Sequence, residues 1–354
     1  MTRAEKLVAA LPSGIDAVLI TDEKTGLYVT KFPASDFTLF VTRSKAYFFT
    51  DFRYIEAAEK AVEGCEVIMP TGRVSEYISK IISEQNIKTV GFEDDKMTVG
   101  TLERYRKVYP DVTFVGLGRL ISDLCTLKDE EEFSKIRAAQ KITDEAFSAV
   151  LTLIKPDMTE IDVAAELEYQ MKKRGAIAPS FETIAVSGTN SARPHGVPRP
   201  VKLEKGFLTM DFGCVYDGYC SDMTRTVVIG RADDEMKKMY DTVLRAQLAA
   251  IDAAHEGLVC ADLDKVARDI IDNAGYAGCF GHSLGHGVGL YIHELPRISA
   301  GNKDVRLEKG HVFTVEPGIY VKGKYGVRIE DMMFITSCGP EDITKSPKQL
   351  IEIC

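Results

Sequence analysis

Residues 208–230, LTMDFGCVYDGYCSDMTRTVVIG, constrain the fold more than any other stretch of the sequence. The Asp-Gly pair at 217–218 is typical of a two-residue type I′ turn, and residues that favour β-strands flank it on both sides. A turn of this kind pairs Tyr216 with Tyr219, so it fixes the register of the two strands. The stretch is therefore predicted to form a β-hairpin.

Two carboxylates lie on this hairpin. Continuing the pairing sets Asp211 opposite Thr224 and Gly213 opposite Asp222, so the two aspartates share one sheet face, roughly 5–8 Å apart at Cβ. Two carboxylates on an apolar face repel each other and resist burial, and a divalent cation removes that conflict. The alternative is a solvent-facing sheet with two ordinary aspartates, although Asp is depleted in strands.

A second hairpin with two carboxylates is predicted over residues 312–335, VFTVEPGIYVKGKYGVRIEDMMFI. A three-residue turn at 323–325 sets Glu316 opposite Met332, and Glu330 then lies diagonally on the same face. The Pro-Gly pair that follows Glu316 permits a bulge, which makes this register less firmly specified than the first one.

The chain has six histidines, and four of them fall in two glycine- or proline-rich stretches, 281–296 and 191–198. Glycine lets the backbone pass close to a bound ligand. The His-Glu pair at 293–294 is not the start of a zinc-protease HExxH motif, because residue 297 is Arg. His255 and His311, outside these stretches, are expected to be structural.

One imidazole with four carboxylates is a borderline-hard ligand set. It suits manganese, cobalt, iron or zinc better than calcium, and it contains no thiolate. Four carboxylates are too many for one small cation, so two divalent metal ions that share bridging carboxylates are predicted.

The order of predicted elements divides the chain into two parts. The first third alternates short strands and helices, and it carries no catalytic cluster. From residue 126 onward, two helices followed by strands occur twice, which indicates one domain of two similar halves around a sheet. Expected strands of the first part are 17–20, 37–50 (a hairpin), 65–70, 88–94 and 112–118, with helices at 74–85 and 99–107. Expected helices of the second part are 128–154, 159–175, 235–254 and 261–274.

Composition and charge narrow the function classes. The 354 residues carry a formal net charge of -9, which argues against a nucleic-acid partner, because such a partner requires a basic face. No apolar run reaches the length of a membrane span, and the N-terminus lacks a signal-peptide core. The eight cysteines form no CxxC pair and are expected to be reduced. The expected location is the cytoplasm.

The motifs MDFG, CSDMTRT, GHGVG with HELP, VEPG and VRIED occur in that order, and together they resemble the Xaa-Pro peptidases of the pita-bread fold. This group contains prolidase, aminopeptidase P and methionine aminopeptidase. The first third, including FTDFRY at 49–54, resembles the N-terminal domain of prolidase and aminopeptidase P, which methionine aminopeptidases generally lack. The resemblance implies an α+β protein with a smaller N-terminal α/β domain of the creatinase type (1–125) and a C-terminal pita-bread catalytic domain (126–354). Cys125 departs from the family pattern, where many relatives carry Arg, but it concerns the linker.

The resemblance also implies roles for individual residues. Asp211 is expected to bind one metal ion, His286 and Glu316 the other, and Asp222 with Glu330 both. Glu316 is further expected to move the proton of the attacking water. His195 and His293 are expected to contact the substrate carbonyl and the developing oxyanion. Residues expected around the substrate are Arg297, which would meet the substrate carboxylate, and His282, Tyr320 and Arg328 near the metals.

The predicted function is hydrolysis of the X–Pro bond at the N-terminus of dipeptides or short peptides, by a homodimer with manganese as the expected metal. Two questions stay open. A dipeptidase must bind the C-terminal carboxylate of its substrate, and Arg297 favours this reading, whereas an aminopeptidase must leave room for further residues. The alternative from another class is a non-peptidase relative, either a binding module or a creatinase-like hydrolase, and the full ligand set argues against both.

Overall fold

Two units make up the computed structural model, which describes residues 1–354: Met1–Cys125 and Thr126–Cys354. None of the helices combines the length and the apolar character that a membrane span requires. The eight cysteines are all free.

The N-terminal unit is built on a six-stranded sheet in the order β4-β3-β2-β1-β5-β6. β1 pairs antiparallel with β2 and parallel with β5, so the sheet is mixed. The strands are β1 Ala17–Ile20, β2 Phe37–Thr42, β3 Ala46–Thr50, β4 Glu66–Ile68, β5 Thr89–Phe92 and β6 Thr113–Gly116. The helices are α1 Arg3–Ala10, α2 Glu23–Thr30, α3 Ile55–Ala61, α4 Val74–Glu84, α5 Val99–Val108 and α6 Leu120–Thr126. All strands expected in this part are present, while α1, α2, α3 and α6 were not expected.

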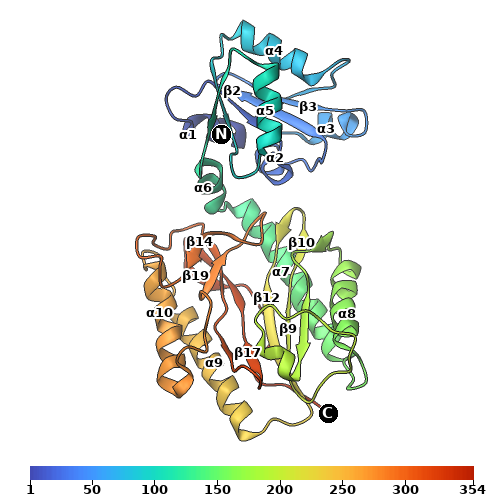
Figure 1. Cartoon of the computed structure of the whole chain (residues 1–354), viewed down its shortest axis with the longest axis vertical. Coiled ribbons are helices and arrows are strands. Elements are labelled where there is room, and N and C mark those ends of the chain that lie inside the picture. Colours follow the sequence, from blue (N-terminus) through green and yellow to red (C-terminus); the bar gives the residue numbers. More distant parts are fainter. The chain divides into compact units, whose positions relative to one another are not determined.

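The C-terminal unit repeats one arrangement twice, as its sequence predicts. α7 and α8 lie on one side of its strands, and α9 and α10 lie on the other (Figure 1). The helices are α7 Glu130–Leu151, α8 Glu160–Lys173, α9 Asp234–Ala253 and α10 Cys260–Ile271. Capping boxes at Asp129 and Thr159 fix the starts of α7 and α8, because each side chain accepts a hydrogen bond from the third helical residue.

Four sheets complete the C-terminal unit, in the orders β11-β10-β7, β20-β12-β9-β8, β14-β13-β15-β18-β19 and β16-β17. The strands of the first half are β7 Ala178–Pro179, β8 Ile184–Ser187, β9 Gly206–Phe212, β10 Cys214–Tyr216, β11 Tyr219–Cys220 and β12 Met223–Ile229. Those of the second half are β13 Gly285–Gly287, β14 Glu294–Ile298, β15 Val312–Val315, β16 Gly318–Tyr320, β17 Gly326–Arg328, β18 Asp331–Thr336 and β19 Gly339–Asp342. The last strand, β20 Glu352–Ile353, returns to pair with β12.

Each half has its own apolar core. Phe147 of α7, Leu167 of α8 and Met210 of β9 belong to the first core. Val243 of α9 and Phe313 of β15 belong to the second. The inner ends of the strands of both halves are thereby held in fixed positions by buried apolar packing.

The first hairpin has the predicted register. Tyr216 pairs with Tyr219, and Asp211 pairs with Thr224. The turn at 217–218 has positive φ at both residues, 48° and 83°, as a type I′ turn requires.

The predicted register of the second hairpin is wrong by two residues. Tyr320 pairs with Gly326, and the N–H of Val321 donates to the carbonyl of Tyr325 at 3.0 Å, so the loop is 322–324 and not 323–325. The reason is that Gly323, at φ 78°, lies in the middle of the loop and not at its start. Because the error is even, the side chains keep their face.

Candidate metal centre

Four carboxylates and one imidazole enter the site from strand ends in both halves of the C-terminal unit. Asp211 lies on β9, and Asp222 immediately precedes β12. Glu316 follows β15 and Glu330 precedes β18, and continuing the β15–β18 register places these two opposite each other. His286 is the middle residue of β13.

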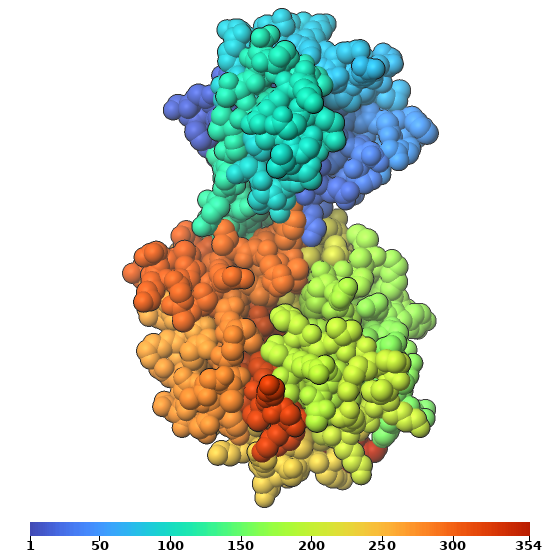
Figure 2. All heavy atoms as spheres, in the orientation of Figure 1, coloured from blue at the N-terminus to red at the C-terminus, as the bar shows by residue number.

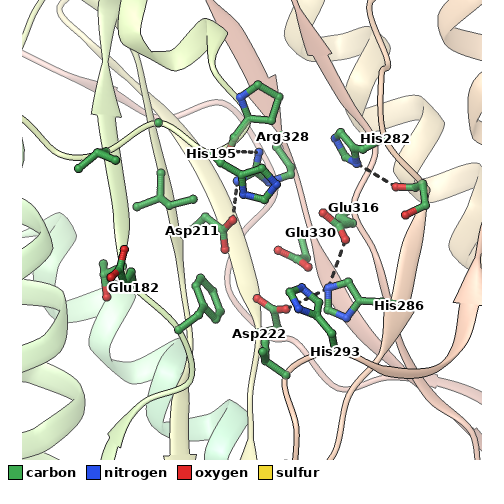
Figure 3. Close-up of a pocket in the computed structure, with 18 of the residues that line it drawn as sticks. Glu182, His195, Asp211, Asp222, His282, His286, His293, Glu316, Arg328 and Glu330 are labelled. Carbon is green, nitrogen blue, oxygen red and sulfur yellow. Dashed lines mark hydrogen bonds and ion pairs between the residues drawn. The ribbon is translucent and has the colours of Figure 1, made fainter. Parts of the chain in front are cut away.

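These five side chains converge (Figure 3). His286 Nε2 lies 3.4 Å from Glu316 Oε1 and 3.6 Å from Asp222 Oδ2. One ligand atom each from Asp222, His286 and Glu330 lie within 4.8 Å of one another. The sequence named all five residues as metal ligands, and the structure brings them together.

His286 has the protonation state that a metal ligand requires. Its Nδ1 donates to the Gly287 carbonyl at 3.1 Å, because a carbonyl only accepts. Burial, with the nearby His293, lowers its pKa to about 4, so the ring is neutral at pH 7. The lone pair of Nε2 is therefore free and faces the carboxylates.

Four carboxylates face each other with a single guanidinium, that of Arg328, paired with one of them, so most of their negative charge is not compensated. Burial, together with the neighbouring carboxylates, raises the pKa of Asp222 and Glu330 well above their usual range. Burial likewise raises the pKa of Glu316 to about 8. Asp211 Oδ1 is buried without a hydrogen-bond partner. A divalent cation supplies what this donor set lacks, so the residues present fit a metal site.

Arg328 joins the cluster to its surroundings through hydrogen bonds. Its Nη2 donates to Asp211 Oδ2 at 2.5 Å, its Nη1 to the Tyr320 hydroxyl at 2.6 Å and its Nε to Thr224 Oγ1 at 3.0 Å. Thr224 Oγ1 in turn donates to Glu330 Oε2 at 2.7 Å. Arg328 and Thr224 thus orient one carboxylate from each half.

His282 extends this chain of hydrogen bonds. Its Nδ1 donates to the Ser283 carbonyl at 2.8 Å, and burial lowers its pKa to about 4. The neutral ring therefore accepts a hydrogen bond at Nε2 from the Tyr320 hydroxyl, 3.0 Å away. His282 and Arg328 line the cavity, whereas Tyr320 lies behind it, and the hydrogen bonds of all three go to protein atoms.

A cavity of about 540 Å³ lies over the carboxylates. It opens between the yellow-green and the orange surfaces of the C-terminal unit in Figure 2, and its walls include segments 181–184 and 194–198. This volume is in the range of small-molecule sites.

His195, His293 and Arg297 all line the cavity and are exposed to it. His195 and His293 approach the carboxylates from different sides (Figure 3). The His293 and His286 rings are 4.4 Å apart, and partial burial, with Arg297 and His195, lowers the pKa of His293. Arg297 forms no ion pair within the protein. The three side chains are thus available to a ligand.

Two histidines lie elsewhere, as expected. His311 is buried, and its Nδ1 accepts from the N–H of Glu308. His255 Nδ1 bonds to the carbonyl of Glu256.

Sequence reasoning missed Thr224 and the wall segment 181–184. Thr224 carried a usable signal, because it lies two residues after Asp222 and so shares its sheet face. Glu182, an exposed carboxylate in that wall, belongs to no motif that marks it.

Comparison with known proteins gives consistent results. The model of metallopeptidase family M24 matches residues 134–337, and that of the creatinase/prolidase N-terminal domain matches residues 3–124. The Xaa-Pro dipeptidase of Pyrococcus horikoshii is 37% identical over 342 residues, which cover 96% of this chain and 95% of the relative.

Solved structures resemble the whole chain. An Xaa-Pro dipeptidase from Bacillus anthracis is 40% identical with a TM-score of 0.95, covering 99% of both chains. An X-Pro aminopeptidase from Thermotoga maritima is 36% identical with a TM-score of 0.93, covering 99% of this chain and 100% of the other.

Proposed function

This chain belongs to metallopeptidase family M24, with a creatinase-type N-terminal domain before a pita-bread domain, and from that membership we propose that it is a dinuclear-metal Xaa-Pro dipeptidase. We assign catalysis to residues 126–354. The observation that carries the proposal is that an unpaired guanidinium, Arg297, lines the same cavity as the carboxylate cluster.

The ligand set supports two divalent ions, with manganese fitting best and cobalt, zinc or iron as alternatives. Asp211, Asp222, His286, Glu316 and Glu330 would hold them. Bound divalent ions supply Lewis-acid polarisation of the scissile carbonyl and activation of water at neutral pH. A non-peptidase relative is not favoured by any observation here.

The protein's own groups move the proton and stabilise the charge. Glu316 faces the cavity beside His286, and in this proposal it takes a proton from the attacking water and returns it to the proline nitrogen. His195 and His293 donate hydrogen bonds to the oxyanion as negative charge develops. Because the amide before proline has no N–H, the site selects the X–Pro bond by shape and not through a donor.

Arg297 is the group that would distinguish a dipeptidase from an aminopeptidase. In a dipeptide the proline carboxylate ends the substrate, and a guanidinium in the cavity binds it through charge-assisted hydrogen bonds. In a longer peptide that carboxylate is replaced by an amide, so the interaction is lost.

The test compares Ala-Pro, Ala-Pro-amide and Ala-Pro-Ala as substrates of the manganese-loaded protein and of Arg297→Gln. Ala-Pro should be the best substrate, and Arg297→Gln should raise its KM about ten- to hundredfold, since a charged hydrogen bond is worth about 1.5–3 kcal/mol. Ala-Pro-amide should be affected little. Arg306→Gln, at an exposed arginine outside the cavity, is the matched control. Faster hydrolysis of Ala-Pro-Ala, with no effect of Arg297→Gln, would identify an aminopeptidase instead.

A further inference from the structure

His195 depends entirely on its backbone for its position. Its imidazole is exposed in the cavity and has no hydrogen bond within the protein. It lies on the segment 188–199, here called the His195 loop, which follows β8. Whatever fixes this loop therefore also fixes the imidazole.

The buried carboxylate of Glu160 holds both ends of the His195 loop. Its Oε1 accepts from the N–H and the hydroxyl of Ser187, at 2.7 and 2.9 Å, and from Arg199 Nη2 at 2.7 Å. Its Oε2 accepts from the N–H and Nε of Arg199, both at 2.9 Å, and from Asn190 Nδ2 at 3.1 Å. Six hydrogen bonds thus join one carboxylate to the residues that enter, begin and end the loop.

The middle of the His195 loop is also linked to Glu160, through Asn190. Asn190 Nδ2 also donates to the carbonyl of Val197 at 3.2 Å, two residues beyond His195. On the other side, Arg328 Nη1 donates to the carbonyl of Pro194 at 3.3 Å. The residues around His195 are therefore linked to Glu160 on one side and to the metal cluster, through Arg328, on the other.

Stabilisation of helix α8 does not account for Glu160. The capping box of Thr159 and Asp162 already satisfies the start of this helix. Glu160 is fully buried, which disfavours a charge, but hydrogen bonds from Arg199 and Ser187 outweigh burial and lower its pKa. A buried charge is costly unless hydrogen bonds satisfy it. The groups that satisfy Glu160 are all in or beside the His195 loop.

We propose that Glu160 and Arg199 are positioning residues, which hold the His195 loop so that the imidazole of His195 reaches the substrate carbonyl. This inference rests on the proposed peptidase function. It extends that function by naming an ion pair, Glu160–Arg199, that does not line the cavity and forms no hydrogen bond with a metal ligand.

The test is a double-mutant cycle with Glu160→Gln and His195→Ala, measured as kcat and KM for Ala-Pro with manganese-loaded protein. Glu160→Gln should lower kcat about ten- to hundredfold, since small displacements of a reacting group are costly, with KM and metal content little changed. In the His195→Ala background, the same substitution should lower kcat by less than about twofold, because its effect passes through His195.

Three measurements make the result decisive. Arg199→Lys keeps the positive charge but loses the planar guanidinium that binds the Glu160 carboxylate, so it should give a smaller fall in kcat. This fall should also vanish in the His195→Ala background. Arg199→Lys takes the place of Glu160→Gln if Glu160→Gln does not fold. Glu341→Gln, at the half-exposed Arg137–Glu341 pair, is the control and should change nothing. Hydrogen exchange of amides 188–199 should rise in Glu160→Gln and stay unchanged in Glu341→Gln.

Equal losses in both backgrounds, or an unchanged kcat in Glu160→Gln, would overturn the positioning role. Failure of the proposed function looks different, because the unaltered protein would then not hydrolyse Ala-Pro at all. Hydrogen exchange of the His195 loop decides the positioning role in that case, and unchanged exchange in Glu160→Gln would refute it.

Discussion

The carboxylate cluster and the two cavity histidines are held in different ways. Asp211, Asp222 and Glu330 lie on or beside paired strands, and the register of each hairpin fixes their backbone. The side chains of Asp222 and Glu330 are buried, and that of Asp211 is paired with Arg328. His195 and His293 are exposed to the cavity, and the segment that carries each one is joined by an ion pair to a residue far away in the sequence, Glu160 or Lys128. The first arrangement is local and repetitive, whereas the second is assembled by tertiary contacts.

Lys128 and Glu294 form the ion pair beside His293. Lys128 Nζ lies 2.7 Å from Glu294 Oε2, and Glu294 Oε1 accepts from the N–H of Tyr291 at 2.9 Å. The pair therefore holds the segment that leads into His293, as the Glu160–Arg199 pair holds the His195 loop. The cluster of negative charge is thus placed by sheet geometry, while the imidazoles of His195 and His293 are placed by ion pairs beside the segments that carry them.

The largest loss of activity should follow from changing a carboxylate that the paired strands hold, such as Asp222. Asp222→Asn should abolish binding of at least one metal ion and lower kcat/KM for Ala-Pro by more than about 10³-fold, since metal polarisation is worth several kcal/mol. Metal content by mass spectrometry and hydrolysis rates test this. Asp217→Asn, at the exposed turn of the same hairpin, is the matched control and should retain metal and activity, because Asn suits a type I′ turn. An active Asp222→Asn protein without metal would reject the mechanism.

The same contrast explains what the sequence could predict. The Asp-Gly turn specified the register of the first hairpin, and with it the relation of Asp211 to Asp222. The predicted register of the second hairpin was wrong by two residues, because the sequence pattern alone does not determine where Gly323 lies within its loop. The sheet face of Glu316 and Glu330 was still predicted correctly, because the error was an even number of residues. The halves of the C-terminal unit could be recognised from repeated helical periodicity.

The supports of the histidines could not be predicted in this way. Lys128 and Glu294 are 166 residues apart, and Glu160 and Arg199 are 39 apart, with no periodicity that joins either pair. Glu160 reads as an ordinary acidic residue in a first helical turn, where it would be expected to be solvated. Its role follows only from the three-dimensional contact of α8 with the His195 loop.

An intermediate effect on activity is expected from breaking the Lys128–Glu294 ion pair that supports the segment of His293. Lys128→Met leaves the carboxylate of Glu294 buried and unpaired, since the side chains are 1% and 9% exposed, and should lower the free energy of unfolding by about 3–5 kcal/mol. The displaced His293 should lower kcat about ten- to hundredfold while metal content is retained. Lys324→Met, at the exposed Lys324–Glu235 pair, should change stability by less than about 1 kcal/mol and leave kcat unchanged. Loss of metal in Lys128→Met would mean that the two regions are not independent.

The smallest effect is a change with pH in the stability of the metal-free protein. It arises from repulsion among the carboxylates of the metal site. Burial raises the pKa of Glu316 in the folded protein from 4.5 to about 8, and burial with the neighbouring carboxylates also raises those of Asp222 and Glu330. The folded state therefore keeps protons that the unfolded state has already released, so stability is lost as pH rises toward the folded pKa. Buried His282 and His286, with pKa lowered from 6.5 to about 4, act in the opposite direction, but only below pH 6.5.

Between pH 6.5 and 8 the carboxylates should thus dominate, and metal-free protein should lose about 1–2 kcal/mol of stability, the free energy of roughly one pKa unit. Denaturant unfolding after metal chelation measures this. Glu330→Gln removes one of the repelling carboxylates and should flatten the slope. Saturating manganese should reverse it, because metal binding requires deprotonated ligands and tightens as pH rises. A metal-free protein with equal stability at both pH values would show that the strands hold the carboxylates without mutual repulsion, and the electrostatic reason for a cation at this site would be lost.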